Sequence, residues 1–234
     1  TIQRSFTHAL VPGERQKRFA LKLGFKPEQI HLRAYCADLH MFDQYYLEMK
    51  AQKAAAFPRR FIYSGRYAKV KDIELLWETF SQFRQETGSD WELYCLGKGD
   101  IPPCEITGIR HVGFIQPDAL KEVLTETSVF ILPSKFEPWG VVVHEFAAAG
   151  FPMILSEDVG AGEAFLEEGK NGFRFQTGSR EALKDCMKRM ASLTQAEFNN
   201  MSTHSHELAH SVTPESWAKV LIDLVHQSRG HVRH

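Results

Sequence analysis

Short apolar runs alternate with amphipathic segments along most of the chain. The runs that predict strands are Phe6–Pro12, Ile30–Cys36, Arg60–Ser64, Trp91–Leu96, Val129–Pro133, Pro152–Ser156 and Phe173–Phe175. Several of these runs are continuously apolar, which is typical of strands that are buried on both faces. Strands that alternate with helices in this way predict an α/β fold with a Rossmann-like, doubly wound, mainly parallel sheet.

The segments between the runs have the periodicity of helices with one apolar face. In Lys71–Thr87, the apolar residues recur at helical spacing, and Gly88 follows as a C-terminal cap. Pro117–Thr127 and Val141–Ala149 show the same pattern. These segments supply the crossover helices that parallel strands require.

The C-terminal part of the chain has a different pattern. Ser179–Leu193, Thr194–His210 and Pro214–Gln227 read as consecutive helices with no strand between them. The last of them carries an apolar stripe that includes Trp217. We therefore expect a helical C-terminal tail that packs across the sheet domain.

One stretch reads as a join between two units. Glu48–Pro58 is rich in Ala and Lys and ends in Phe57-Pro58. We accordingly divide the chain into residues 1–57, a Rossmann-like domain over residues 58–212, and a C-terminal helix and tail over residues 213–234.

Composition excludes some classes of protein. The 234 residues carry 28 basic and 29 acidic side chains, so no net positive charge indicates binding to nucleic acid. No apolar run approaches the ~20 residues of a membrane helix. The four cysteines are not closely spaced, which favours reduced thiols and a cytoplasmic location over a zinc or disulfide framework.

Candidate chemistry follows the ends of the predicted strands, where open parallel sheets bind their ligands. Gly65 and Arg66 come directly after a strand, and Lys71 lies five residues after the arginine. Two cations at a strand end suit a diphosphate, although cations on loops are also commonly just solvated. Gly97-Lys98-Gly99 follows the next strand and indicates either close approach of a ligand or an ordinary turn.

The most informative stretch surrounds Glu137 and Glu145. A buried strand ends at Pro133, a polar loop carries Glu137, and Gly140 opens a helix that carries Glu145. Free backbone N–H groups at such a helix start favour anions. The two carboxylates can contact different parts of one elongated ligand. The alternative is that Glu137 caps the helix and Glu145 faces solvent.

In combination, these segments resemble glycosyltransferase family 4, a family of retaining enzymes with the GT-B fold. The resemblance runs from about Phe6 to Phe175. Its strongest element is the pair Glu137 and Glu145, in a stretch that begins with Pro-Ser-x-x-Glu-Pro-x-Gly and ends near Ala149-Gly150. Gly65-Arg66, Gly97-Lys98-Gly99, His111-Val112-Gly113-Phe114, Gly162-Glu163 and Asn171-Gly172 follow in the expected order. The resemblance implies the C-terminal, donor-binding half of such an enzyme.

The family implies a role for each matching residue. Arg66 and Lys71 would neutralise the donor diphosphate, Glu137 would contact the transferred sugar, and Glu145 would bind the ribose. The catalytic set would be Arg66, Lys71 and Glu137. Further donor-binding positions would be Gly65, Gly97, Gly113, Phe114, Pro138, Trp139, Gly140 and Val141. Gly113 and Phe114 would hold the base, and residues 139–141 would offer backbone N–H groups.

The resemblance also implies the substrates and partners. The donor would be a UDP- or GDP-sugar, with no cofactor and no catalytic metal, and the acceptor a glycan or lipid, as in polysaccharide synthesis. Residues 1–57 would be a remnant of the N-terminal acceptor lobe and the crossover, so this chain alone is expected to bind nucleotide but to be inactive in transfer. Many relatives work at the inner face of the membrane through that lobe.

The chain departs from the family pattern at Asp72, where the family often has Gly. An acid at this position is expected to weaken the attraction for phosphate slightly. Trp139 stands where Phe is frequent, which is a milder change.

Two other readings of the whole remain open: a sugar-nucleotide epimerase of similar fold, and a binding module that has lost catalysis. Epimerases use a different set of carboxylates and histidines, and the intact basic pair argues against decay.

A histidine cluster near the C-terminus is interpreted as surface. His204, His206 and His210 lie on one predicted helix, two of them at i, i+4 spacing. A zinc site needs at least a third ligand and an oriented second shell, and the segment shows neither. His231 and His234 are interpreted as tail residues.

Overall fold

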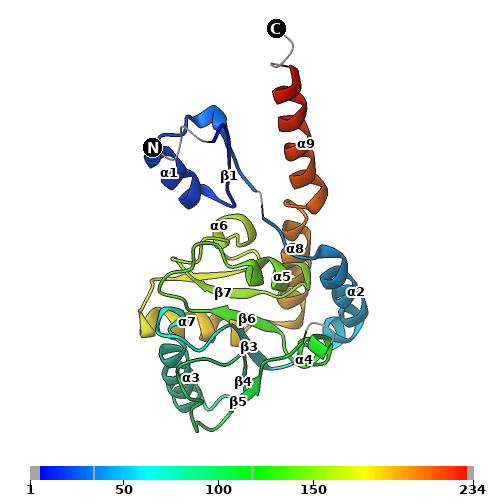
Figure 1. Cartoon of the computed structure of the whole chain (residues 1–234). Coiled ribbons are helices and arrows are strands. Elements are labelled where there is room, and N and C mark those ends of the chain that lie inside the picture. Colours follow the sequence, from blue (N-terminus) through cyan, green and yellow to red (C-terminus); the bar gives the residue numbers. More distant parts are fainter. Residues whose placement is uncertain (1–5, 34, 117–118, 231–234) are drawn as a thin grey trace.

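The computed structural model describes residues 6–33, 35–116 and 119–230. Within them, a six-stranded parallel sheet has the order β5-β4-β3-β6-β7-β8 (Figure 1). The strands are β3 (Arg60–Ser64), β4 (Glu92–Leu96), β5 (Ile109–Gly113), β6 (Val129–Leu132), β7 (Met153–Ser156) and β8 (Gly172–Phe175). In chain order this is 3-2-1-4-5-6, so the strand order reverses between β3 and β6. The predicted doubly wound sheet is confirmed.

Helices flank this sheet in two groups. The helices α3 (Ile73–Thr87) and α7 (Arg180–Ala191) pack against each other. The helices α5 (Val141–Ala148) and α8 (Gln195–Ala209) pack together with α2 (Leu39–Ala55) in the second group. Two short helices, α4 (Leu120–Glu126) and α6 (Gly162–Phe165), complete the connections. The helix predicted from Pro117 has its first two residues outside the described part of the chain.

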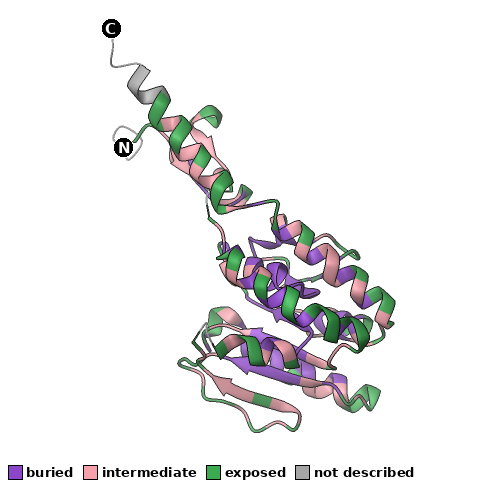
Figure 2. Cartoon of the chain, turned by 90° about the vertical axis from the view of Figure 1, so that its right-hand side faces the viewer, coloured by how far each residue is buried: buried purple, intermediate pink, exposed green. Residues whose placement is uncertain are grey.

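The core lies in the centre of the sheet, as the continuous apolar runs predicted. All residues of β6 and β7 are buried (Figure 2). The Phe130 ring stacks on Phe146 of α5 at a centroid distance of 4.1 Å. Trp77 and Trp91 are also buried. The strand β6, which lies at the switch point, is therefore tightly packed on both faces.

The stretch Glu48–Pro58, which we expected to join two units, is mostly helical. The helix α2 continues to Ala55, and only residues 56–58 separate it from β3. Ala, Gln and Lys are strong helix formers, which explains why this stretch stays helical. Asp38 caps the helix by accepting a hydrogen bond from the Met41 N–H at 3.3 Å. The boundary between residues 57 and 58 remains a prediction.

The edge strand β5 was not predicted as a strand. Ile109–Gly113 pairs in parallel with β4, and its residues are only partly buried or exposed. Because it lies at the edge and contains Arg110 and His111, it lacks the apolar run that marks the central strands.

Residues 6–33 form a small unit with its own apolar cluster. The strands β1 (Ala9–Leu10) and β2 (Ile30–His31) pair in parallel, and α1 (Glu14–Lys22) connects them. Val11, Ala20 and Phe25 form the buried centre of this unit. The predicted strands Phe6–Pro12 and Ile30–Cys36 are thus much shorter in the structure.

The C-terminal tail also differs from expectation. The helix α8 packs against α5 and α2, but α9 (Pro214–Gly230) extends away from the sheet domain on the side of the N-terminal unit (Figure 1). The side chain of Trp217 is half-buried. None of the described helices is long and apolar enough to cross a membrane.

Candidate functional site

Two adjoining hollows open at the carboxyl ends of the strands, at the switch point between β3 and β6. The first has a volume of about 450 Å³ and the second of about 520 Å³. Residues that follow β3, β4 and β5 line the first hollow, together with the start of α2. The loop between β6 and α5 lines the second. Gly65 and Glu145 line both, so a long ligand can occupy the two hollows together.

Glu145 lies between the hollows on the second turn of α5. Its side chain has no hydrogen-bond partner among the described residues, and burial raises the pKa of its carboxyl group. A half-buried carboxylate without a partner is poorly solvated and readily accepts hydrogen bonds from a ligand's hydroxyl groups. The alternative in which Glu145 faces open solvent is therefore wrong.

Glu137 forms an ion pair with Lys71 across the second hollow. The Lys71 ammonium donates to Glu137 Oε2, and both side chains are largely buried, with exposed fractions of 22% and 13%. The helix α5 begins at Gly140 with no side-chain cap, so Glu137 does not cap it. The structure thus joins one of the two predicted cations to one of the two predicted carboxylates.

Arg66 lies at the edge of the first hollow with an exposed guanidinium group. Its nearest acid is Asp100, at 4.0 Å, and 68% of the arginine side chain is exposed. An ion pair of this length and exposure is worth little. Arg66 can therefore turn toward an anionic ligand at small cost.

The glycines after β3 and β4 have a packing role as well as a place in the first hollow. Gly97 has a φ of +116°, and a Cβ atom there would lie 2.0 Å from the Gly65 carbonyl oxygen. A Cβ on Gly99 would lie 2.3 Å from the Tyr67 carbonyl oxygen. The two loops therefore approach each other too closely for larger residues. This tight packing explains Gly97 and Gly99 without a ligand.

Of the two expected base-binding residues, Phe114 lines the first hollow and Gly113 precedes it at the end of β5. Gly113 ends β5 with a φ of +83° and open space around its Cα. Phe114 lines the hollow with 66% of its surface exposed, an unusual state for a phenylalanine. An exposed aromatic ring beside open space offers a surface on which a planar ring can stack.

The loop from Pro138 to Val141 forms one wall of the second hollow. Gly140 has a φ of +88°, and a Cβ there would lie 2.8 Å from Glu137 Cγ. The backbone N–H groups of Trp139 and Gly140 have no acceptor among the described residues. They lie at the start of α5, where the helix dipole also favours negative charge.

The N-terminal unit contacts this wall directly. Arg15 of α1 forms an ion pair with Asp158 at 3.2 Å, and Gln16 donates to the Pro138 carbonyl. Glu163 accepts a hydrogen bond from the Glu14 N–H at 3.2 Å. The Gly162-Glu163 segment therefore holds α1 and does not point its carboxylate into the hollows.

Among the lining residues missed in the sequence, three come from around the start of α2. Met41 and Phe42 on α2 line the first hollow, and Tyr35 lines the second. They belong to the segment before α2 and to the first turn of that helix. In the sequence this segment is far from the strand ends where we expected the site. The Asp38 cap was the only local signal that a helix begins there.

A buried histidine anchors this segment. His144 Nδ1 accepts a hydrogen bond from the Ala37 N–H at 3.0 Å, and its Nε2 donates to the Ala209 carbonyl at 2.9 Å. Burial lowers the pKa of His144 to about 4. The neutral ring thus ties the chain before α2 to the end of α8.

Asp72 occupies a strained but compensated position. Its backbone is left-handed, with φ 51° and ψ 38°, and its carboxylate pairs with Lys135 at 2.7 Å. The left-handed backbone gives a physical reason for glycine at this position in the family. Because Lys135 offsets the charge, the acid opposes phosphate binding less than expected.

We expect Asp72→Ala to lower the free energy of unfolding by about 1–2 kcal/mol, since alanine tolerates the left-handed region poorly and loses the ion pair. Asp72→Gly should cost clearly less, because glycine adopts this backbone without strain. Urea denaturation of both variants measures the difference. Equal losses in the two variants would show that backbone strain is not the cause.

The fold, with its ligand crevice at the switch point, defines a Rossmann-like α/β lobe of the GT-B kind. A family model described as "Glycosyl transferases group 1" matches residues 58–192, which is more than half of the chain. The chain therefore belongs to the group 1 glycosyltransferases.

Individual relatives agree with this assignment. The chain is 30% identical over 116 residues to an uncharacterized glycosyltransferase of Methanocaldococcus jannaschii, a match that covers 46% of this chain and 29% of the relative. It is 34% identical over 140 residues to the sulfoquinovosyl transferase SQD2 of Arabidopsis thaliana, covering 56% and 26%. The chain thus spans less than a third of the length of these two relatives.

Solved structures show the same fold. Sucrose-phosphate synthase from Thermosynechococcus elongatus superposes with a TM-score of 0.74 at 21% identity, covering 95% of this chain and 58% of that one. Anabaena HepE in complex with UDP gives a TM-score of 0.75 at 14% identity, covering 96% and 65%. At these identities the likeness concerns the fold.

Proposed function

We propose that this chain is the donor-binding part of a retaining glycosyltransferase of family 4, which transfers a hexosyl group from a UDP- or GDP-sugar. The observation that carries the proposal is the pair of hollows joined at Glu145. One hollow has an arginine and an exposed aromatic ring, and the other has the Lys71–Glu137 pair and free backbone N–H groups. A nucleotide and its sugar need these two environments side by side.

The proposed donor position follows the chemistry of each hollow. The base stacks near Phe114, and the ribose hydroxyls donate to Glu145. The diphosphate lies between Arg66 and Lys71, close to the start of α5, where two cations and a helix dipole stabilise its charge. The sugar lies against Glu137 and the 138–140 loop.

Transfer with retention then needs charge stabilisation at the leaving diphosphate more than a strong nucleophile. Arg66 and Lys71 take the role that a divalent cation plays in other transferases, so no catalytic metal is proposed. Glu137 holds both the sugar and the Lys71 ammonium, which fixes the cation beside the leaving oxygen. The acceptor, a glycan or lipid, binds through a further lobe, so this chain alone binds nucleotide without transferring sugar.

A thermal-shift titration with UDP, GDP, ADP and their sugar conjugates tests the proposal. We expect one nucleotide to raise the melting temperature in a concentration-dependent manner and thereby to identify the base. Arg66→Ala should reduce that shift, while Arg59→Ala, an exposed arginine before β3, should leave it unchanged. No shift with any nucleotide, in a chain that folds, would contradict the proposal.

Glu145→Ala should weaken nucleotide binding about 10- to 100-fold, because each hydrogen bond to a charged group is worth about 1.5–3 kcal/mol. Isothermal titration calorimetry with the nucleotide that binds best measures this change. Glu122→Ala, on the exposed face of α4, is the matched control. Unchanged nucleotide affinity in Glu145→Ala would contradict the proposal that Glu145 binds the ribose.

A further inference from the structure

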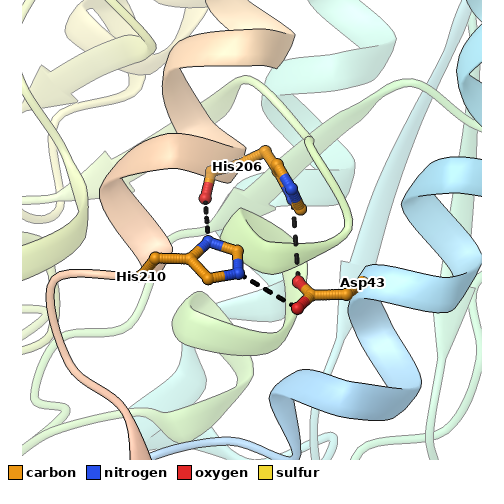
Figure 3. A group of neighbouring side chains, drawn as sticks. All are labelled: Asp43, His206 and His210. Atoms are coloured by element: carbon orange, nitrogen blue, oxygen red, sulfur yellow. Dashed lines mark hydrogen bonds and ion pairs between the residues drawn. The ribbon is translucent and has the colours of Figure 1, made fainter.

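A second cluster of polar side chains lies where α2 meets α8, and none of its members lines either hollow. Asp43 of α2 faces two histidines (Figure 3). His206 lies in α8, and His210 is the C-terminal cap of that helix. One ligand atom from each of the three lies within 4.8 Å of the other two. The sequence offered only the two histidines at i, i+4 spacing. The third ligand comes from a helix more than 160 residues earlier in the chain.

Backbone carbonyls orient both imidazole rings. His206 Nδ1 donates to the Ala148 carbonyl at 2.7 Å, and His210 Nδ1 donates to the His206 carbonyl at 2.8 Å. A carbonyl oxygen can only accept, so both Nδ1 atoms carry protons. The ring of His206 also stacks on Tyr46 at a centroid distance of 3.8 Å. Histidines that bind metals through Nε2 are held in this manner, with the other ring nitrogen donating to a carbonyl or carboxylate.

The contact between His210 and Asp43 requires a proton or a metal ion between the two side chains. His210 Nε2 lies 3.0 Å from Asp43 Oδ2, while its Nδ1 already donates to a carbonyl. In a neutral ring Nε2 would be an acceptor facing another acceptor. A proton or a metal ion must therefore lie between the two atoms. In a tetrahedral zinc site with bonds of ~2.0–2.1 Å, neighbouring ligand atoms are roughly 3.3 Å apart, close to the observed separation.

The other carboxylate oxygen of Asp43 is an independent sign of a missing partner. Asp43 Oδ1 is buried and has no hydrogen-bond donor, because His206 Nδ1, 3.8 Å away, donates to the Ala148 carbonyl instead. A buried carboxylate oxygen without a partner is costly. A proton on His210 would satisfy Oδ2 alone, whereas the charge of a metal ion between the three side chains would stabilise both oxygens while one of them binds it.

We propose that Asp43, His206 and His210 bind a divalent transition-metal ion, with Zn²⁺ the best match to two imidazoles and one carboxylate. The fourth position is left for water, because the three side chains remain 20–40% exposed. The ion clamps α2 to α8. Since α2 also carries Met41 and Phe42, the clamp fixes the helix that lines the first hollow. This structural role is separate from the proposed transfer reaction.

Titration of the metal-free chain with Co²⁺, followed by visible absorption, tests the proposal. Co²⁺ reports four-coordinate sites by intense d–d bands, and displacement by Zn²⁺ then gives the relative affinity. We expect one equivalent to bind. Asp43→Asn and His210→Gln should each weaken binding at least 10- to 100-fold. His204→Gln is the matched control, because His204 lies on the same helix but pairs with Glu167 at 3.0 Å. Metal binding by this variant should be unchanged.

Two results would overturn the proposal. One is a chain that gives no four-coordinate Co²⁺ spectrum. The other is binding that persists unchanged in both variants, which would place the metal on other histidines. Circular dichroism in EDTA shows whether each variant folds. If Asp43→Asn does not fold, His210→Gln decides alone, because His210 is exposed at the helix end and its replacement leaves the core intact.

Discussion

Replacing Lys71 with alanine is expected to lower kcat/KM of the complete transferase by on the order of 100- to 1000-fold. The Lys71 ammonium is largely buried, and Glu137 holds it at the edge of the second hollow. In the proposed reaction this cation stabilises the negative charge that develops on the departing diphosphate. The substitution removes that charge and also leaves the buried Glu137 carboxylate without its partner, which repels the donor phosphates.

Lys69→Ala is the matched control for this prediction. Lys69 belongs to the same short helical turn, Lys69–Lys71, but its side chain is exposed. Steady-state kinetics with the nucleotide-sugar identified by calorimetry measure both variants. Most of the loss in Lys71→Ala should appear in kcat, because the interaction strengthens as the leaving group departs. A loss confined to KM would restrict Lys71 to donor binding, and equal effects of the two substitutions would refute its catalytic role.

The site residues at the strand ends could be predicted from the sequence, because local sequence patterns identify the strands that they follow. The continuous apolar runs of β3, β4 and β6 identify central strands, and ligands in such sheets bind beyond their carboxyl ends. That rule is sufficient to place Arg66, Glu137 and Glu145 around one crevice, and the structure brings them there. The Lys71–Glu137 contact is an additional, tertiary consequence of the order in which the strands pair.

Other parts of the site depend on contacts between segments that are distant in the chain. Met41 and Phe42 line the first hollow only because α2 packs against α5 and α8. Similarly, Asp43 reaches the two histidines of α8 through the same packing, so the cluster was interpreted as surface. Gly97 has a second structural reason that the sequence did not reveal, because it lines the first hollow and also lies in close contact with the loop at Gly65.

The second large effect is expected at acidic pH, through His144. Burial lowers the pKa of His144 from 6.5 to about 4, and the neutral ring both accepts from Ala37 and donates to Ala209. The contribution of this residue is complete above the unfolded-state pKa of about 6.5 and is lost as pH falls toward 4, because the unfolded chain takes up the proton first. A shift of this size corresponds to about 3 kcal/mol of unfolding free energy.

His144→Gln separates this effect from the other titrating groups. Glutamine can both accept and donate, but it does not titrate, so the variant should be less stable at pH 7 and should depend less on pH. Urea denaturation between pH 7.5 and 4.5 in EDTA, with the stability of the variant subtracted from that of the original chain, isolates the residue. The difference should shrink steadily as pH falls, since only the original chain gains a buried charge at this site. A difference that stays constant across the range would mean that His144 takes up a proton equally in the folded and the unfolded chain, and His144 would then not be the link that acid breaks between α2 and α8.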